Sequence, residues 1–353
     1  MSITAAPSAG ITAALAAALL FGATTPIAKL FLAGSNPLLM AGMLYVGSGV
    51  GLFLMRVVRD RGWRPSGLAH ADWPWLAGAI VAGGMLAPAL LMFGLSRSDA
   101  ATASLLLNLE TIFTAALAWW VFREATNRRV VWGFLAILVG ATLLAWPARI
   151  DLGRSLGLLC IVGACLCWGL DNNLTRKISA ADPRAIASFK GLVAGSTNTI
   201  LALSLGATFP PLPRVAGTLA LGFLGYGVSL VLFIVALRQL GTVRTGAYFS
   251  TAPFIGTALA AAVYGQPLTA TFYLAALLIV FGVWLHVTEH HDHEHLHESL
   301  THTHSHRHDA HHQHQHDEQW SGNEPHTHEH HHVPVRHSHA HFPDIHHEHQ
   351  HRE

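Results

Sequence analysis

Histidine is concentrated in the C-terminal segment 290–353, which holds 25 of the chain's 27 histidines and has neither cysteine nor methionine. Neutral imidazole suits nickel, cobalt, zinc and copper(II), whereas copper(I) prefers sulfur ligands. A flexible chain with a histidine at every second position can surround one such ion with several nitrogens. The alternating histidines are the predicted metal ligands: His291, His293, His295, His297, His302, His304, His306, His308, His312, His314, His316, His326, His328, His330, His337, His339, His341, His347, His349 and His351.

The same segment is polar and acidic. It carries 11 Asp and Glu against 3 Arg, and it mixes histidine with Ser, Thr and Gln over 64 residues, unlike a purification tag. The acids favour capture of cations, and ligand type does not separate nickel and cobalt from zinc. Because such a polar segment cannot form a packed core, the sequence predicts a disordered, metal-binding tail over 290–353.

A second set of chemically active residues lies within otherwise apolar stretches. Glu110 follows a run of leucines, and Asp171 is followed directly by Asn172 and Asn173. A charged side chain at membrane depth costs free energy and by default marks function. The predicted transport path comprises Glu110, Asp171, Asn172, Asn173, Lys190 and Tyr248.

These polar groups also have structural alternatives. Asp171 and Lys190 fall on adjacent spans near the same membrane side, so they could simply pair and fix the helix register. Glu110 is the only charged residue in its span, so it needs a partner from another helix or a water-filled cavity. Arg244 opens a span and is interpreted as a helix-end residue whose charge reaches the interface.

The scaffold that must position these residues is a membrane domain. The chain is 51% hydrophobic and only 12% charged. Short connections separate stretches that approach or exceed the roughly 20 apolar residues needed to span hydrocarbon. The ten stretches are 10–32, 37–58, 73–95, 100–122, 130–147, 155–174, 186–207, 215–237, 243–264 and 269–288. The sequence therefore predicts an all-α membrane protein with ten transmembrane helices.

Basic residues orient this bundle. With the N-terminus in the cytoplasm, the inner connections carry 11 Lys and Arg and the outer connections carry 5. Such an excess on the cytoplasmic side is the rule for multi-pass proteins. An even number of spans then returns the tail to the cytoplasm. The N-terminus lacks a basic region followed by a cleavage site, so 10–32 is predicted to be a retained span.

The chain also aligns with itself. Residues 94–124 match 236–266 without gaps at a constant offset of 142, and Phe21-Gly22 aligns with Trp168-Gly169. The alternative is chance similarity between apolar helices. A true repeat predicts five spans per half, and an odd number places the halves in opposite orientations, as in secondary transporters. The predicted domains are 1–147, 148–289 and the tail 290–353.

Several segments carry a resemblance to a known family. They are Phe21 to Lys29, Leu109 to Ala115, Arg123-Glu124, Trp168 to Lys177, Lys190 to Gly195 and Arg244 to Pro253. Over residues 10–288 the chain resembles ten-span permeases of the drug/metabolite transporter superfamily with the EamA-type repeat. This resemblance implies fold and transport but not the substrate. Thr111 stands where a proline often follows the glutamate, and Gln266 stands where the second repeat usually carries an acid.

A permease with a histidine-rich tail further resembles membrane proteins of bacterial nickel and cobalt resistance determinants. The leading hypothesis is therefore export of divalent metal, nickel first and cobalt next. Protons would drive this export, the cytosolic tail would capture metal, and Glu110 and Asp171 would titrate or coordinate. The alternatives are export of an amino-acid-like metabolite with a tail that only buffers or senses metal, metal uptake, and a membrane-anchored metal store.

Other classes are not favoured. No nucleophile–base pair or nucleotide-binding loop is evident, so we expect a transporter rather than an enzyme, with no cofactor required for transport. The expected partners are the lipid bilayer and divalent metal ions, not nucleic acid, and a homodimer is an open alternative to a single copy. The expected location is the bacterial inner membrane, with both termini in the cytoplasm.

Overall fold

The computed structural model describes residues 7–60, 67–122, 128–145, 152–178, 181–265, 268–287, 292–297, 300–306, 326–332 and 335–340. Its helices are α1 (Pro7–Leu32), α2 (Pro37–Asp60), η1 (His70–Asp72), α3 (Trp73–Ala79), η2 (Ile80–Leu86), α4 (Ala87–Arg97), α5 (Ala100–Leu106), α6 (Leu109–Phe122), α7 (Arg128–Ala145), α8 (Leu152–Lys177), α9 (Pro183–Ser204), α10 (Leu212–Gly222), η3 (Phe223–Val228), α11 (Ser229–Phe249), α12 (Ala252–Tyr264) and α13 (Ala270–Val287). The strands are β1 (Asp292–His297), β2 (Leu300–His306), β3 (His326–His332) and β4 (Val335–Ala340).

The helices confirm the helical membrane domain in its coarse form. Six of those described are long and apolar enough to cross a membrane: Ala9–Leu32, Pro37–Arg59, His70–Arg97, Ser155–Lys177, Pro183–Ser204 and Leu212–Ala236. Four shorter apolar helices are Ala100–Thr114, Val131–Leu143, Ala252–Tyr264 and Ala270–Leu285. Each of these ten falls at one of the predicted stretches, and the count of ten crossings stays a prediction.

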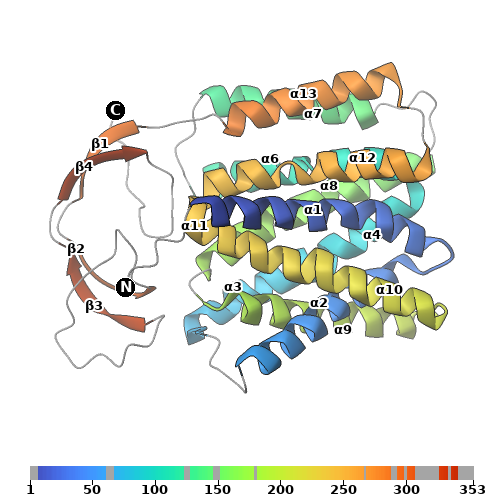
Figure 1. Cartoon of the computed structure of the whole chain (residues 1–353), viewed down its shortest axis with the longest axis horizontal. Coiled ribbons are helices and arrows are strands. Elements are labelled where there is room, and N and C mark those ends of the chain that lie inside the picture. Colours follow the sequence, from blue (N-terminus) through green and yellow to red (C-terminus); the bar gives the residue numbers. More distant parts are fainter. Residues whose placement is uncertain are drawn as a thin grey trace.

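The long helices lie side by side in one bundle (Figure 1). The pair α7 and α13 forms one side of the bundle, and α2, α9 and α10 lie towards the opposite side. Helix α1 begins and helix α13 ends at the same end of the bundle, and the four strands lie beside that end. A chain that begins and ends at the same end of a bundle has passed through it an even number of times.

Local sequence sets where the helices start and stop. Asp99 caps α5 because its carboxylate accepts the backbone N–H of Thr102 at 2.7 Å. Asp182 caps α9 in the same way, and Pro183 follows in the first turn, where its missing N–H costs nothing. Gly265 ends α12 with a φ of 59°, a backbone conformation that glycine adopts without strain.

Two predicted spans are interrupted, which the hydropathy pattern did not reveal. The stretch 100–122 divides into α5 and α6, because the Asn108 side chain donates to the Leu105 carbonyl and competes with the helical ladder. The boundary predicted between 237 and 243 is wrong, because α11 continues to Phe249. Helix α12 begins only at Ala252, with Pro253 in its first turn.

The same irregularities recur in both halves of the chain. The turn at 250–251 follows the turn at 107–108 by 143 residues. The π-helical segment η3 ends 142 residues after the π-helical segment η2. Packing repeats as well: α8 contacts α4 and α6 as α1 contacts α11 and α12, while α2 packs on α9 and α7 on α13. These correspondences support the internal repeat read from the sequence.

Within the tail the structure describes four strands, and disorder of the segment as a whole stays a prediction. Strand β1 pairs antiparallel with β4, and β2 pairs antiparallel with β3. Histidines two residues apart keep the same pleat position, so the alternating sequence suits an extended ladder. Other predicted positions lie outside the described residues, namely Gln266, His291, His308, His312, His314, His316, His341, His347, His349 and His351.

The crossing of α2 and α9 depends on glycine. A Cβ atom built on Gly49 would lie 2.6 Å from the carbonyl carbon of Gly191, so the two backbones touch. We expect Gly49→Ala to lower the free energy of unfolding by about 1–3 kcal/mol through overpacking. Thermal unfolding in detergent measures this. Gly163→Ala is the control, because its Cβ would meet only Leu90 Cδ1 at 3.4 Å; equal melting temperatures for both variants would contradict the close crossing.

Candidate functional site

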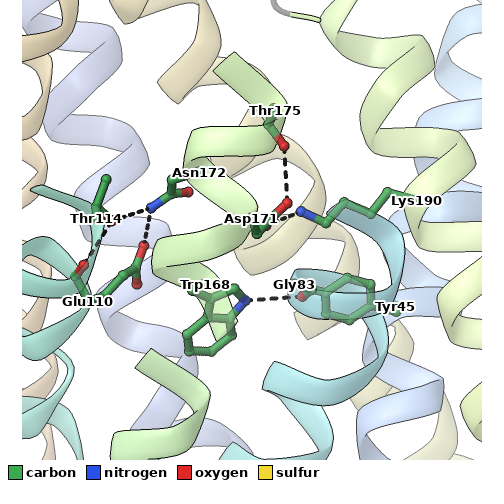
Figure 2. Close-up of polar contacts among 9 residues, drawn as sticks. All are labelled: Tyr45, Gly83, Glu110, Thr114, Trp168, Asp171, Asn172, Thr175 and Lys190. Carbon is green, nitrogen blue, oxygen red and sulfur yellow. Dashed lines mark hydrogen bonds and ion pairs between the residues drawn. The ribbon is translucent and has the colours of Figure 1, made fainter. Parts of the chain in front are cut away.

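Glu110 lies in the first turn of α6, directly after the break that separates α6 from α5. Its side chain is half-buried. The Asn172 amide of α8 donates to Glu110 Oε1 at 2.9 Å and to Thr114 Oγ1 at 3.1 Å (Figure 2). The hydrogen-bond partner of Glu110 on another helix is therefore an amide. Among the residues that the structure describes, no positively charged group forms an ion pair with this carboxylate.

Asn173, the next residue of α8, also joins α8 to α6. Its amide donates to the backbone carbonyls of Thr114 at 2.9 Å and Gly169 at 2.8 Å. Both bonds are to backbone carbonyls, and only 4% of the residue is exposed. Asn173 therefore has a structural role in holding α8 against α6, whereas the Asn172 amide binds a side-chain carboxylate.

Asp171 and Lys190 form a buried ion pair between α8 and α9 (Figure 2). The Asp171 side chain also accepts the Thr175 hydroxyl at 3.0 Å. Only 4% of Asp171 and 5% of Lys190 are exposed. The pairing that the sequence left as an alternative is thus present, and its burial makes both charges costly to leave unpaired.

The π-helical segment η2 covers this ion pair. A Cβ atom on Gly83 would overlap the Asp171 side chain, and one on Gly84 would lie 3.4 Å from Lys190 Cγ. The Gly83 carbonyl accepts the Tyr45 hydroxyl at 2.7 Å and the Trp168 indole N–H at 3.1 Å. Single π-turns are frequent at functional sites because they redirect backbone groups within a helix.

Aromatic side chains gather beside these networks, and the sequence analysis missed them. The Tyr45 and Tyr226 rings are 5.2 Å apart, and Phe21 contacts Trp168 edge to face at 5.9 Å. Tyr and Trp usually lie at membrane interfaces, so their positions well inside apolar stretches were a usable signal. Buried phenol and indole groups also require hydrogen-bond partners, which points to a polar interior.

Five of the six predicted path residues contribute to the two networks, and they lie on α6, α8 and α9. Tyr248 instead packs, half-buried, against Ala13, Ala14 and Ala236. Its neighbour Phe249 faces the aromatic group, with its ring 5.4 Å from Phe21. Within the part of the chain that the structure describes, no group of three or more His, Cys, Asp and Glu could hold a metal ion.

Comparison with known proteins decides the family. The sequence model of the EamA-like transporter family matches residues 8–146 and 155–288, one match in each half of the chain. The chain belongs to the EamA-like transporter family. As such it is a multi-pass membrane transporter, and the polar networks of α6, α8 and α9 lie inside its transmembrane bundle.

Individual relatives agree with this assignment. An uncharacterised transporter of Methanothermobacter thermautotrophicus is 25% identical over 78% of this chain and 85% of its own length. A probable 4-amino-4-deoxy-L-arabinose-phosphoundecaprenol flippase subunit, ArnE of Pseudomonas aeruginosa, is 33% identical over 31% of this chain and 92% of its own length. A solved crystal structure shares the fold, with a TM-score of 0.59, 19% identity, and coverage of 81% of this chain and 99% of its own.

Proposed function

We propose that this EamA-like transporter exports divalent transition metal, nickel first and cobalt next, from the cytoplasm. The histidine-rich tail carries the proposal. Its backbone register sets His302 opposite His330 and His304 opposite His328 between β2 and β3. Directly opposed residues of an antiparallel pair have Cβ atoms about 4.5–5.5 Å apart. Paired histidine positions at that spacing suit capture of an ion that prefers imidazole.

The tail would act by raising the metal concentration at the inner mouth. A weak binding site tethered beside a pore increases local occupancy without any new contact in the pore. The orientation expected from the basic residues would put the tail in the cytoplasm. The strands lie beside the bundle end where α1 begins (Figure 1). Cytosolic ions would therefore meet the tail before they meet the bundle.

The two networks would form the path through the bundle. Glu110 and Asp171 offer carboxylates, and Asn172 offers an amide oxygen, within neighbouring helices. Few and exchangeable oxygen ligands suit an ion that must leave again. Alternating access of two oppositely oriented halves around this site, driven by protons in a bacterial inner membrane, completes the proposal.

Deleting residues 290–353 tests the capture role. We expect cells that express the shortened protein to lose nickel tolerance at low metal and to approach full-length tolerance at saturating metal, because capture matters only when the path is sparsely occupied. Growth across a nickel series measures this. A full-length variant with glutamine at every tail histidine is the matched control. Equal tolerance of full-length and shortened proteins at every concentration would rule out capture.

A second candidate function is export of an amino-acid-like metabolite, and the Asp171–Lys190 ion pair favours it. Its opposite charges could receive the ammonium and the carboxylate of a zwitterion. Everted membrane vesicles separate the two candidates. Export from cells corresponds to accumulation inside such vesicles, so uptake of radioactive nickel but not of a radioactive amino-acid mixture supports metal export. The reverse result supports metabolite export.

A further inference from the structure

The two halves of the bundle differ at the ion pair. The alignment of Phe21-Gly22 with Trp168-Gly169 makes Thr24 the counterpart of Asp171. Contacts agree with this correspondence. A Cβ atom on Gly83 would lie 2.5 Å from Asp171 Cβ, and one on Gly225, 142 residues later, would lie 3.0 Å from Thr24 Cβ. A π-helical glycine thus packs on the same helix position in each half.

The counterpart of Lys190 is also uncharged. Asn36-Pro37 aligns with Asp182-Pro183 at the start of α2 and α9, which makes Leu44 the counterpart of Lys190. Leu44 is fully buried, and Thr24 is buried at 1% exposure. The first half therefore achieves the same helix packing with a leucine and a threonine where the second half buries two charges. The fold does not require an ion pair at this position.

Packing does not explain the ion pair, so another role must be sought. Burying two charges costs free energy that their mutual attraction only partly offsets. If the pair only braced the helices, an uncharged pair such as the threonine and leucine of the first half would serve as well. The charged pair can do what the uncharged pair cannot. The lysine ammonium lies at the end of a flexible four-carbon chain and can leave the carboxylate without movement of a helix. Another cation can then take its place at the carboxylate.

We propose that the Lys190 ammonium is a tethered cation that competes with the transported cation for Asp171. This inference rests on the proposed export of divalent metal. In the empty transporter Lys190 neutralises Asp171, so the bundle can change conformation without an uncompensated buried charge. An arriving metal ion displaces the ammonium from the carboxylate. On release of the ion, Lys190 returns to Asp171 and opposes rebinding.

Substitutions at Lys190 test competition in opposite directions. Lys190→Gln removes the competitor, so the KM for radioactive nickel should fall by roughly tenfold. Net efflux into nickel-free buffer should also become slower relative to nickel–nickel exchange. Lys190→Arg keeps the charge and can bind a carboxylate through two parallel hydrogen bonds, so it should raise the KM by roughly tenfold. A structural brace predicts a wild-type KM for the arginine variant.

Full-length protein in proteoliposomes, loaded with radioactive nickel, provides these measurements. Lys29 supplies matched controls, because its ammonium donates to the carbonyls of Leu95 in α4 and of Ser98, which directly follows α4. Lys29→Gln and Lys29→Arg should leave the KM for nickel unchanged. If Lys190→Gln does not fold, the arginine variant decides alone.

The outcomes separate this inference from the proposed function. Opposite KM shifts at Lys190, absent at Lys29, support the tethered cation. Wild-type nickel transport with an unchanged KM in both Lys190 variants, or with both raised, overturns the tethered cation and leaves metal export standing. Wild-type protein that carries no nickel overturns metal export, and this inference with it.

Discussion

Replacing Asp171 by asparagine is expected to abolish transport and to lower the free energy of unfolding by about 3–5 kcal/mol, the cost typical of breaking a buried ion pair from one side. The substitution leaves the Lys190 ammonium at 5% exposure with its counter-charge removed. The Thr175 hydroxyl can still donate to the new amide oxygen, so the loss arises mainly from the missing charge. Thermal unfolding in detergent and nickel flux in proteoliposomes measure the two effects.

A double variant distinguishes stability from function. Asp171→Asn combined with Lys190→Met removes both charges and resembles the uncharged first half, so most of the lost stability should return while transport stays absent. Apolar replacement of a buried pair is often neutral or stabilising. A double variant as unstable as Asp171→Asn alone, or an Asp171→Asn variant with normal flux, would contradict a buried pair at the centre of the path.

Much of the fold was predictable because the signals are local. Each of the ten predicted apolar stretches coincides with a long or a shorter apolar helix. The offset of 142 between the halves also separates the ends of the two π-helical segments, which the structure adds. The breaks at 107–108 and 250–251 were missed, because hydropathy averages over a whole span. A single asparagine or proline decides a helix end and barely changes that average.

The site was predictable in part for the same reason. Rare charges within apolar stretches identified Glu110, Asp171 and Lys190. These residues lie in one region of the bundle because α8 contacts both α6 and α9 there. Tyr248 was selected from its place beside Arg244, but helix geometry turns Phe249 rather than Tyr248 towards Phe21. Tyr45 and Trp168 meet at one carbonyl, Gly83, from sequence positions more than a hundred residues apart, which no local pattern encodes.

The tail depends on two different properties of its sequence. Low apolar content predicts disorder over 290–353, which stays a prediction, and where the structure describes the segment the backbone pairs β1 with β4 and β2 with β3. Composition measures how much core a segment can bury, whereas strand pairing depends on the period of the sequence. The metal ligands proposed there rest on histidine positions and backbone register alone.

Replacing Glu110 by glutamine is expected to reduce transport by about tenfold or more while leaving the bundle folded. Glutamine has nearly the same shape and its amide oxygen can still accept the Asn172 bond, which is 2.9 Å long in the wild-type protein. What disappears is the negative charge that would meet a metal ion or a proton. Hydrogen bonds to charged groups are worth about 1.5–3 kcal/mol, so the loss of a charged ligand should reduce nickel flux by roughly tenfold or more.

Thr114→Val is the matched control for Glu110→Gln. It removes the hydroxyl that accepts the Asn172 amide at 3.1 Å and keeps the charge of Glu110. We therefore expect the valine variant to keep most of its flux and its response to an imposed proton gradient, and the glutamine variant to lose both at an unchanged melting temperature. Full flux in the glutamine variant would reduce Glu110 to a packing residue. Equal losses in both variants would assign the effect to the α6–α8 contact rather than to the carboxylate.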